Sequence, residues 1–348
     1  FENLTKRLAQ HDVVCSPRSD EECLEILKEA GKISEVAGTF TEVLPLIREM
    51  RPDPLELSRH IEAMPRHQRP RARILFDLML PVVQRYENHL SESAEIDFSD
   101  MIRQAIQLLE SGQIRSKFSH ILIDEFQDIS KPRADLALAL GRSRPDSTVF
   151  CVGDDWQSIY RFTGSDIRYS SQFRELVGPG TVTALDQTFR FNDQIGQLAA
   201  QFVSRNPAQI QKQIESVRKV EEPAVSLVRT ADPHLGLSAI LAQANRWAES
   251  KLNEFSVFVL ARYHYELDAL RREYRDWNRQ FSRISSLKFS TVHGAKGLEA
   301  DLVVVVGMEP GRNGFPADKP IDSFRELFLP PAEEFTFSEE RRLFYVAI

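Results

Sequence analysis

Two adjacent carboxylates follow a short apolar run in the first half of the chain. Asp124 and Glu125 come directly after Ile121–Ile123, and Gln127 and Asp128 follow at once. In an NTPase, the first carboxylate of such a pair holds Mg²⁺, usually through water, and the second orients the attacking water. Acids at a strand end are also common as solvated loop residues, so the pair alone leaves both interpretations open. The amide and acid that follow favour the catalytic one.

A second apolar run, Thr148–Val152, leads into Gly-Asp-Asp, then Gln157, then an aromatic series. Gln157 could contact the γ-phosphate of a nucleotide. Tyr160 and Phe162 could offer flat faces to unstacked bases, an interaction worth ~1–3 kcal/mol per base that tolerates any sequence. The alternative is that one or both of these rings belong to the core.

Two later segments could also meet phosphate. Arg190 follows the apolar run Thr181–Leu185 and could stabilise charge on a transferring phosphoryl group, although a single Arg is usually a surface or ion-pair residue. The run Lys288–Val292 leads into His293, Gly297 and Glu299 through a Gly-rich turn whose backbone N–H groups could meet phosphates. His293 by itself could equally be a buried histidine.

The sequence pattern predicts that the elements that position these residues form an α/β fold. The chain is helical in texture up to about Ser116, with prolines that divide it into short pieces. Beyond Phe118, apolar runs alternate with helical stretches, which indicates parallel sheets covered on both faces. Ligands of such sheets bind beyond the carboxyl ends of the strands, where these polar residues lie. The predicted strands are Ile121–Ile123, Thr148–Val152, Thr181–Leu185, Ser226–Val228, Phe255–Leu260, Lys288–Val292 and Leu302–Val306, and the predicted helices between them are Lys131–Leu140, Asp193–Ser204, Leu235–Ser250 and Tyr263–Asp276.

Three smaller features complete the prediction. The run Val303–Val306 has no polar alternation, which predicts a strand buried on both faces. The Gly- and Pro-rich stretch Gly307–Pro331 predicts a long loop. The stretch Glu339–Ile348 predicts an amphipathic helix whose charges, taken alone, form a solvated face.

Composition limits the class of protein. The 348 residues are 42% hydrophobic and 27% charged, with no apolar run near the about 20 residues that a membrane helix needs. Three cysteines without a CxxC pair disfavour structural zinc and disulfides and fit a cytoplasmic protein. The formal net charge of -7 argues mildly against nucleic-acid binding, although a local groove can still be positive.

Five of these segments, in this order, resemble the UvrD/Rep family of superfamily 1 DNA helicases. They are DEFQD, GDDWQSIYRFTGSD, LDQTFRF, TVHGAKGLEADLVVVVGMEPG and EERRLFYVAI, and a shorter match is IDFSDMI at residues 96–102. The resemblance implies RecA-like parallel sheets of a P-loop NTPase core, ATP and Mg²⁺ as cofactors, and single-stranded and duplex DNA as partners. It implies an ATP-dependent 3′–5′ helicase of the kind that acts in DNA repair.

The resemblance also assigns roles to residues of this chain. Asp124 would hold Mg²⁺ and Glu125 would position water, while Gln157 would contact the γ-phosphate and Arg190 would act as an arginine finger. The remaining assignments are Gly297 and Glu299 at the nucleotide, and Tyr160, Phe162, Thr291 and His293 along the DNA strand.

The chain departs from the family pattern in its phosphate-binding loop, because it contains no GxxxxGK[ST]. It also lacks an initiator Met and stops in mid-pattern, so we expect a fragment whose P-loop lies upstream of Phe1 and which is inactive alone. We expect an α-helical subdomain over 1–112, part of a first RecA-like lobe over 113–190, and a second lobe over 191–348 without the family's large 2B insertion. Two alternatives stay open: the motor of a helicase-nuclease, or an ATP-driven remodeller of a protein partner such as RNA polymerase.

Overall fold

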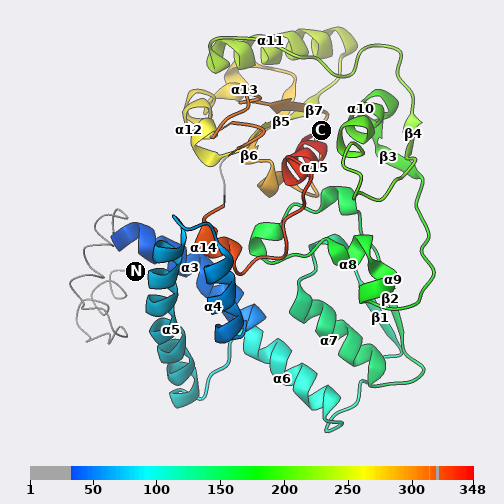
Figure 1. The fold of residues 1–348 in the computed structure, drawn as a ribbon. Helices are drawn as coiled ribbons and strands as arrows, with labels where there is room; N and C mark the ends of the chain where they lie inside the picture. The colour runs from blue at the N-terminus through cyan, green and yellow to red at the C-terminus, as the bar shows by residue number, and fades with distance from the viewer. Residues whose placement is uncertain (1–32, 313, 319–320) are drawn as a thin grey trace. The chain divides into compact units, whose positions relative to one another are not determined.

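The computed structural model describes residues 33–312, 314–318 and 321–348, and shows an α/β fold of parallel strands and many helices (Figure 1). The α/β prediction is therefore confirmed. The helical texture predicted before residue 33 lies outside the described residues. Among the described helices, none is long and apolar enough to cross a membrane. The described residues form two compact units: 33–153, 160–169 and 321–332 in the first, and the remainder in the second.

The first unit begins with four helices, as the sequence predicts for this stretch. They are α3 (Ile33–Met50), α4 (Pro54–Ala63), α5 (Arg69–Glu92) and α6 (Phe98–Glu110). Pro54 stands in the first turn of α4, where no intrahelical N–H is needed. The prediction that every proline divides the helices is wrong at Pro45 and Pro81, which lie inside α3 and α5. Each has buried apolar residues beside it, such as Val43 and Met79, whose packing offsets one lost hydrogen bond.

The core of this helical part includes residues from far along the chain. Phe324, at 0% exposure, and Phe328 pack with Val43, Ile61 and Leu75. Burial of such a side chain stabilises by about 1.5–3 kcal/mol relative to exposure. The loop predicted over Gly307–Pro331 is therefore only partly correct, because a short helix, α14 (Ser323–Glu326), inserts its apolar residues between the first helices.

Two parallel strands complete the first unit. β1 (His120–Ile123) pairs with β2 (Thr148–Cys151), and α7 (Lys131–Arg142) connects them, as the sequence predicts. Leu122 and Phe150 are 73% and 61% exposed, so one face of the pair is open and apolar. The short helices that follow in the chain are η1 (Phe126–Asp128), η2 (Asp155–Gln157), η3 (Arg161–Thr163), α8 (Arg168–Ser171) and α9 (Phe173–Leu176).

The second unit contains a three-stranded parallel sheet of order β6-β5-β7. Its strands are β5 (Phe255–Ala261), β6 (Ile284–Thr291) and β7 (Leu302–Val305), close to three of the predicted runs. β5 is central and almost wholly buried, whereas β7 is an edge strand and is half-buried apart from Val304. The prediction that Val303–Val306 is buried on both faces is therefore wrong, because only Val304 is buried and the other three valines remain partly accessible.

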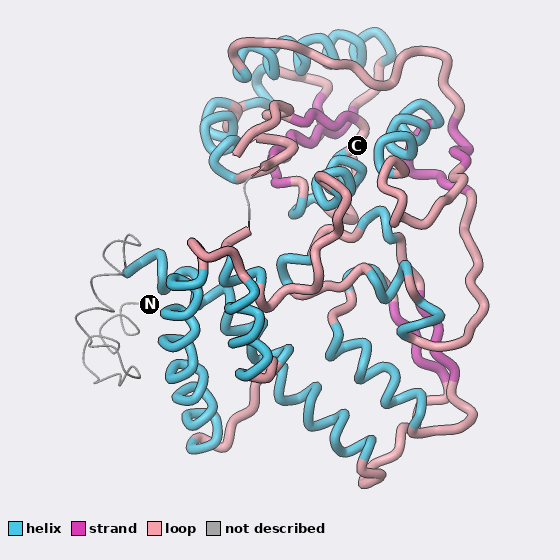
Figure 2. The backbone as a smooth tube through the Cα atoms, viewed as in Figure 1, coloured by secondary structure: helices cyan, strands magenta, loops and turns pink. Residues whose placement is uncertain are grey.

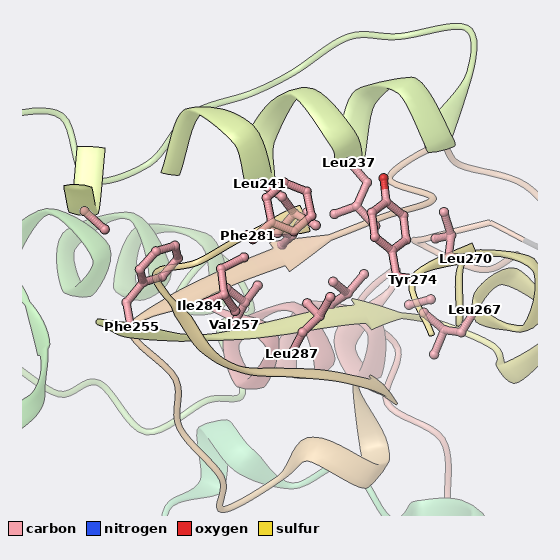
Figure 3. Packing of buried hydrophobic residues seen from close by; sticks show 14 residues of the cluster. Leu237, Leu241, Phe255, Val257, Leu267, Leu270, Tyr274, Phe281, Ile284 and Leu287 are labelled. Carbon is pink, nitrogen blue, oxygen red and sulfur yellow. The ribbon is translucent and has the colours of Figure 1, made fainter. Parts of the chain in front are cut away.

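Helices cover this sheet and close its core. Leu237 and Leu241 of α11 (Pro233–Lys251) point toward Val257, Ile284 and other apolar side chains of the strands (Figure 3). Two helices connect β5 to β6, namely α12 (His264–Glu273) and α13 (Trp277–Gln280), and they fill the stretch where the 2B insertion is expected to be absent.

A second parallel pair in this unit differs from the prediction. β3 (Gln187–Asn192) pairs with β4 (Glu215–Arg218), and α10 (Asp193–Val203) follows β3. The strands predicted at Thr181–Leu185 and Ser226–Val228 are wrong, because both segments are loops (Figure 2). Leu185 and Leu227 are 83% and 91% exposed, and an apolar run without a strand to pair with gains neither hydrogen bonds nor burial. The last helix, α15 (Ser338–Ala347), forms as predicted and packs on α10.

Candidate functional site

The two carboxylates form an exposed turn at the carboxyl end of β1. Val152 N–H donates to Ile123 O and Phe126 N–H donates to Val152 O, both at 2.8 Å, so the chain beyond β2 holds both sides of the turn. Between them Glu125 adopts φ 49° and ψ 43°, a left-handed conformation that non-glycine residues rarely take. The side chains of Asp124 and Glu125 are both solvent-accessible. The turn therefore presents its carboxylates outward at some cost in backbone strain.

A buried amide orients the second carboxylate. Gln127 is 1% exposed, and its Nε2 donates to Glu125 Oε2 at 2.5 Å. Gly153 makes room for this amide, because a Cβ at that position would lie 2.6 Å from Gln127 Oε1. The sequence pattern alone gives no role to Gln127 or Gly153. The features that could have indicated one are the spacing of Gln127, two residues after Glu125, and the place of Gly153 directly after the predicted strand Thr148–Val152.

The donor set of this turn fits Mg²⁺ held together with a nucleotide. Carboxylate oxygens are the protein ligands that Mg²⁺ prefers, and one or two of them suffice when phosphates and water complete the shell. Among the described residues, no group of three or more His, Cys, Asp or Glu forms a metal cage. Asp124 and Glu125 thus fit a Mg²⁺ ion whose other ligands are phosphate oxygens and water, and the chain has no GxxxxGK[ST] loop to bind the phosphates.

The aromatic pair predicted to face DNA lies in the same unit as the acidic turn. The rings of Tyr160 and Phe162 are half-buried, with centroids 6.0 Å apart at 60°. Burial and the carboxylates of Asp128 and Glu125 raise the pKa of Tyr160. Arg325 lies over the Phe162 ring at 5.9 Å and donates to Phe162 O at 2.7 Å. The rings are neither fully core nor fully free.

Gln157 belongs to the second unit. It ends η2, which Asp154 begins by accepting from Trp156 N–H at 3.1 Å, and its Nε2 donates to Asp154 Oδ2 at 2.8 Å. Asp154 is also paired with Lys212 at 2.5 Å. The Gln157 amide is therefore held beside a charged pair and remains half-buried.

The structure brings Arg190 and Glu299 together. Arg190 Nε lies 4.0 Å from Glu299 Oε2, and the two side chains are 55% and 76% exposed. The prediction that Arg190 follows a strand is wrong, because it lies within β3. Gly297 precedes Glu299 in the turn after β6 and has φ +79°, a conformation that costs glycine little. An exposed pair at this distance contributes little to stability, so its charges remain available to a ligand.

Thr291 and His293 lie at the carboxyl end of β6. Thr291 is 8% exposed, and its Oγ1 accepts from Gly294 N–H at 3.2 Å, which makes it part of the turn. Burial, together with the charge of Arg262, lowers the pKa of His293 to about 4, although a hydrogen bond with the Ile159 backbone acts in the opposite direction. The imidazole is therefore neutral at pH 7 and lies against the segment that carries Gln157.

The ten predicted site residues thus fall into two groups, one in each unit. The first contains Asp124, Glu125, Tyr160 and Phe162, and the second contains Gln157, Arg190, Thr291, His293, Gly297 and Glu299.

Lys296 and Arg342 also contact the Gln157 segment and were not predicted. Arg342 is 1% exposed, so the interpretation of the charges of the last helix as a solvated face is wrong for this residue. The only feature of the sequence that could have indicated its burial is the position of Arg342 directly before apolar residues.

Comparison with known proteins identifies the family of the chain. The UvrD/REP helicase N-terminal domain family matches residues 23–177, and the UvrD-like helicase C-terminal domain family matches residues 275–348. DNA helicase IV of Escherichia coli is 39% identical over 78% of this chain, and the chain spans 38% of that protein. The motifs also resemble those of bacterial DNA helicase IV, and the match to the Escherichia coli protein agrees with that resemblance.

Other relatives match over shorter stretches. The putative ATP-dependent DNA helicase YjcD of Bacillus subtilis is 31% identical over 39% of the chain and 18% of its own length. The ATP-dependent DNA helicase UvrD1 of Mycobacterium tuberculosis is 30% identical over 38% of the chain and 18% of its own length. Because both domain families match in order along the sequence, the chain belongs to the UvrD/REP helicase family.

Proposed function

We propose that this chain is part of an ATP-dependent DNA helicase motor that couples ATP hydrolysis to 3′–5′ translocation on single-stranded DNA and to duplex unwinding. Its relatives carry the name ATP-dependent DNA helicase or DNA helicase. Because the chain spans 38% of DNA helicase IV, the activity belongs to the longer protein that contains it.

The observation that carries the proposal is the acidic turn. Glu125 is held in a left-handed conformation with its carboxylate bonded to the buried Gln127 amide, an arrangement that a solvated loop acid does not need. The strain and the buried partner both support a catalytic role. A bound Mg²⁺ would neutralise charge on the β- and γ-phosphates, and Asp124 is the carboxylate that we assign to hold it.

The remaining residues then have distinct tasks. Glu125 orients the attacking water and accepts its proton, while Gln157 contacts the γ-phosphate. Arg190 stabilises charge on the transferring phosphoryl group, a role in which a single Arg can contribute about 10³–10⁵ in rate. Gly297 and Glu299 contact the nucleotide from the turn after β6, and the exposed pair Arg190–Glu299 can separate to do so.

DNA would lie along aromatic and polar side chains. Tyr160 and Phe162 offer half-buried ring faces on which bases of any sequence can stack. Thr291 and His293 of the second unit are the other residues to which we assign contact with DNA. Thr291 is nearly buried, so its contribution is limited to its backbone or to one edge of its side chain.

We also propose the division into subdomains: residues 1–112 as a helical subdomain, 113–190 as part of a first RecA-like lobe, and 191–348 as most of a second. The compact units support a helical first part. The boundary between the compact units differs from the proposed boundary at residue 190, because residues 154–159 and 170–190 belong to the second unit.

The test compares the full-length protein with its Glu125→Gln variant. We expect strand displacement on substrates with a 3′ single-stranded tail, little on substrates with a 5′ tail, and loss of both ATPase and unwinding in the variant. Glu95→Gln, an exposed loop acid, is the matched control and should retain activity. Wild-type ATPase without strand displacement would contradict the helicase proposal and favour a remodeller of a protein partner.

The chain itself provides a second test. Because it contains no GxxxxGK[ST], we expect the isolated 348 residues to bind ATP weakly and to hydrolyse none. Magnesium-dependent turnover by the purified chain would contradict this expectation.

A further inference from the structure

The segment Asp154–Ile159 carries Gln157, and hydrogen bonds from two other parts of the second unit hold its backbone. Arg342 of α15 donates from Nε to Ser158 O at 2.6 Å. Lys296, in the turn after β6, donates from Nζ to Gln157 O at 3.0 Å. Two successive carbonyl oxygens, those of Gln157 and of the next residue, thus each accept a hydrogen bond from a cationic side chain.

Each of the three guanidinium nitrogens of Arg342 has a partner in this arrangement. At 1% exposure, it also donates from Nη1 to Gln209 Oε1 at 2.8 Å and pairs through Nη2 with Glu333 Oε2 at 2.6 Å. Burial by itself raises the pKa of Glu333, but the hydrogen bonds from Arg342 and Asn206 outweigh it and leave that pKa below its usual value. The Arg342–Glu333 pair is therefore charged at neutral pH. Its contacts hold the guanidinium of Arg342 in place beside the Ser158 carbonyl.

The same helix touches the segment one turn later. Tyr345 lies three residues after Arg342, so both side chains project from one face of α15. Its ring meets Trp156 edge-on at 5.4 Å, and its hydroxyl lies 3.4 Å from Asp154 Oδ2. Asp154 Oδ2 is also the acceptor of the Gln157 side-chain amide. α15 therefore contacts the segment on both sides of Gln157.

We propose that Arg342 and Lys296 are positioning residues that set the conformation of Gln157, and so make its γ-phosphate contact depend on α15 and on the turn after β6. The proposal rests on the role assigned to Gln157 under the proposed function. Hydrogen bonds from charged donors are about twice as strong as neutral ones, so removal of either donor takes a strong bond from a backbone carbonyl of the segment. Displacement of a contacting group by about 1 Å can cost about 10²-fold in rate.

The experiment is a double-mutant cycle in the full-length protein. Arg342→Lys and Lys296→Met are each made alone and together with Gln157→Ala, and DNA-stimulated ATPase is measured over a range of ATP concentrations. Each single variant should lower kcat by about 10- to 100-fold with a smaller change in KM. In the Gln157→Ala background, the same substitutions should change kcat by less than about twofold, because the group that they position is already absent.

Two controls separate positioning from folding. Arg341→Lys changes the neighbouring residue of α15, whose guanidinium lies over the Phe202 and Phe335 rings, and it should retain wild-type kcat. Lys296→Arg keeps a cationic donor and should restore most of the activity that Lys296→Met loses. If Arg342→Lys does not fold, the half-buried Lys296 carries the cycle alone.

The outcomes are distinguishable. Effects of Lys296→Met and Gln157→Ala that multiply would show that Lys296 acts independently, and the positioning proposal would be wrong. Wild-type activity in Gln157→Ala itself would instead remove the role proposed for Gln157, which is a failure of the proposed function at that residue.

Discussion

Arg190 Nε and Glu299 Oε2 lie 4.0 Å apart across the second unit, one on β3 and the other in the turn after β6. Both side chains are more than half exposed, so the pair is not a structural requirement of the fold. Surface pairs of this kind contribute about 0–1 kcal/mol. Two charged groups that meet at the surface with little effect on stability are suited to exchange their partner for a ligand.

The first prediction follows from this exposure. Arg190→Ala should change the free energy of unfolding by no more than about 0.5 kcal/mol, because it removes only an exposed pair. If Arg190 stabilises the transferring phosphoryl group, kcat for ATP in the full-length protein should fall by about 10³ or more. Urea unfolding and steady-state ATPase assays measure the two effects. A large loss of stability with little loss of kcat would assign Arg190 a structural role instead.

The second prediction concerns the close approach of Gly153 to the acidic turn. In Gly153→Ala the new Cβ would lie 2.6 Å from Gln127 Oε1 and 3.1 Å from the backbone nitrogens of Phe126 and Gln127. We expect a loss of about 1–3 kcal/mol in the free energy of unfolding from overpacking, and reduced kcat because the Glu125 partner is displaced. Urea unfolding and ATPase of the full-length protein check both.

Gly38→Ala is the matched control for that substitution. Gly38 lies inside α3, and nothing is within 4 Å of its added Cβ. Since glycine within a helix costs about 0.5–1 kcal/mol relative to alanine, this variant should be slightly more stable than wild type and equally active. Equal effects of the two substitutions would show that the contact with Gln127 is not the cause.

The sequence predicts those parts of the fold that local patterns determine. β5 is a continuous apolar run and α15 has helical periodicity, and both form as predicted because burial and local hydrogen bonds favour the same conformation. The runs Thr181–Leu185 and Ser226–Val228 are predicted as strands on the same kind of pattern, yet they form loops. A strand requires a pairing partner, and periodicity carries no information about whether one is present.

The candidate site also contains features that the sequence predicts and features that it does not. The positions of Asp124, Gln157 and Glu299 in the segments that follow β1, β2 and β6 agree with parallel-sheet geometry and with the family motifs. The role of Arg342 could not be identified, because it depends on a contact with a segment much earlier in the chain. Gln127 lies only two residues from Glu125, but the local pattern does not show that its amide is buried and donates to that carboxylate. A charged residue in a helix is usually solvated, and only the fold shows that Arg342 is not.

The third prediction concerns Arg48, which is 4% exposed and joins α3 to the beginning of α6. Its guanidinium bonds to Asp97 at 3.1 Å, Asp100 at 2.7 Å and Glu87 at 2.6 Å. Arg48→Met should destabilise the full-length protein by about 3–5 kcal/mol at pH 7, because it leaves Asp100 buried beside fewer cations. Urea unfolding measures the loss, and Arg85→Met, an exposed arginine of α5, is the control with an expected change below about 0.5 kcal/mol.

The acid dependence of the same network has a definite sign. Burial by itself raises the pKa of Asp100, but hydrogen bonds and charge from Arg103 and Arg48 outweigh it and leave the pKa below its ordinary value of 3.8. A lowered carboxyl pKa contributes stability that is present above 3.8 and is lost as pH falls through the folded-state pKa. The difference between wild type and Arg48→Met should therefore shrink below about pH 4. A difference that does not depend on pH would show that packing of the Arg48 stem, and not its charge, stabilises the helices.

The fourth prediction tests the insertion of α14 into the first helices. Phe324 is 0% exposed and meets the Phe328 ring edge-on at 5.3 Å. Phe324→Ala should cost about 3–5 kcal/mol, mostly as a cavity, and should speed hydrogen exchange in α3 and α5. Phe98→Ala removes an equally large side chain that is 84% exposed and should leave exchange in these helices unchanged. Unaltered exchange of α3 in Phe324→Ala would mean that α14 does not contribute to this core.

The fifth prediction is a pH dependence that comes from His293. Burial and Arg262 lower its pKa from 6.5 to about 4 in the folded protein, so between these values the unfolded chain binds a proton that the folded chain does not. Stability should then rise with pH across this window, by up to about 3 kcal/mol for this group. Urea unfolding at pH 5 and at pH 7 should show a smaller difference in His293→Gln than in wild type, while His264→Gln, an exposed histidine, should behave as wild type. The same slope in wild type and His293→Gln would mean that this imidazole is solvated, and the contact with Ile159 would then not hold it against the Gln157 segment.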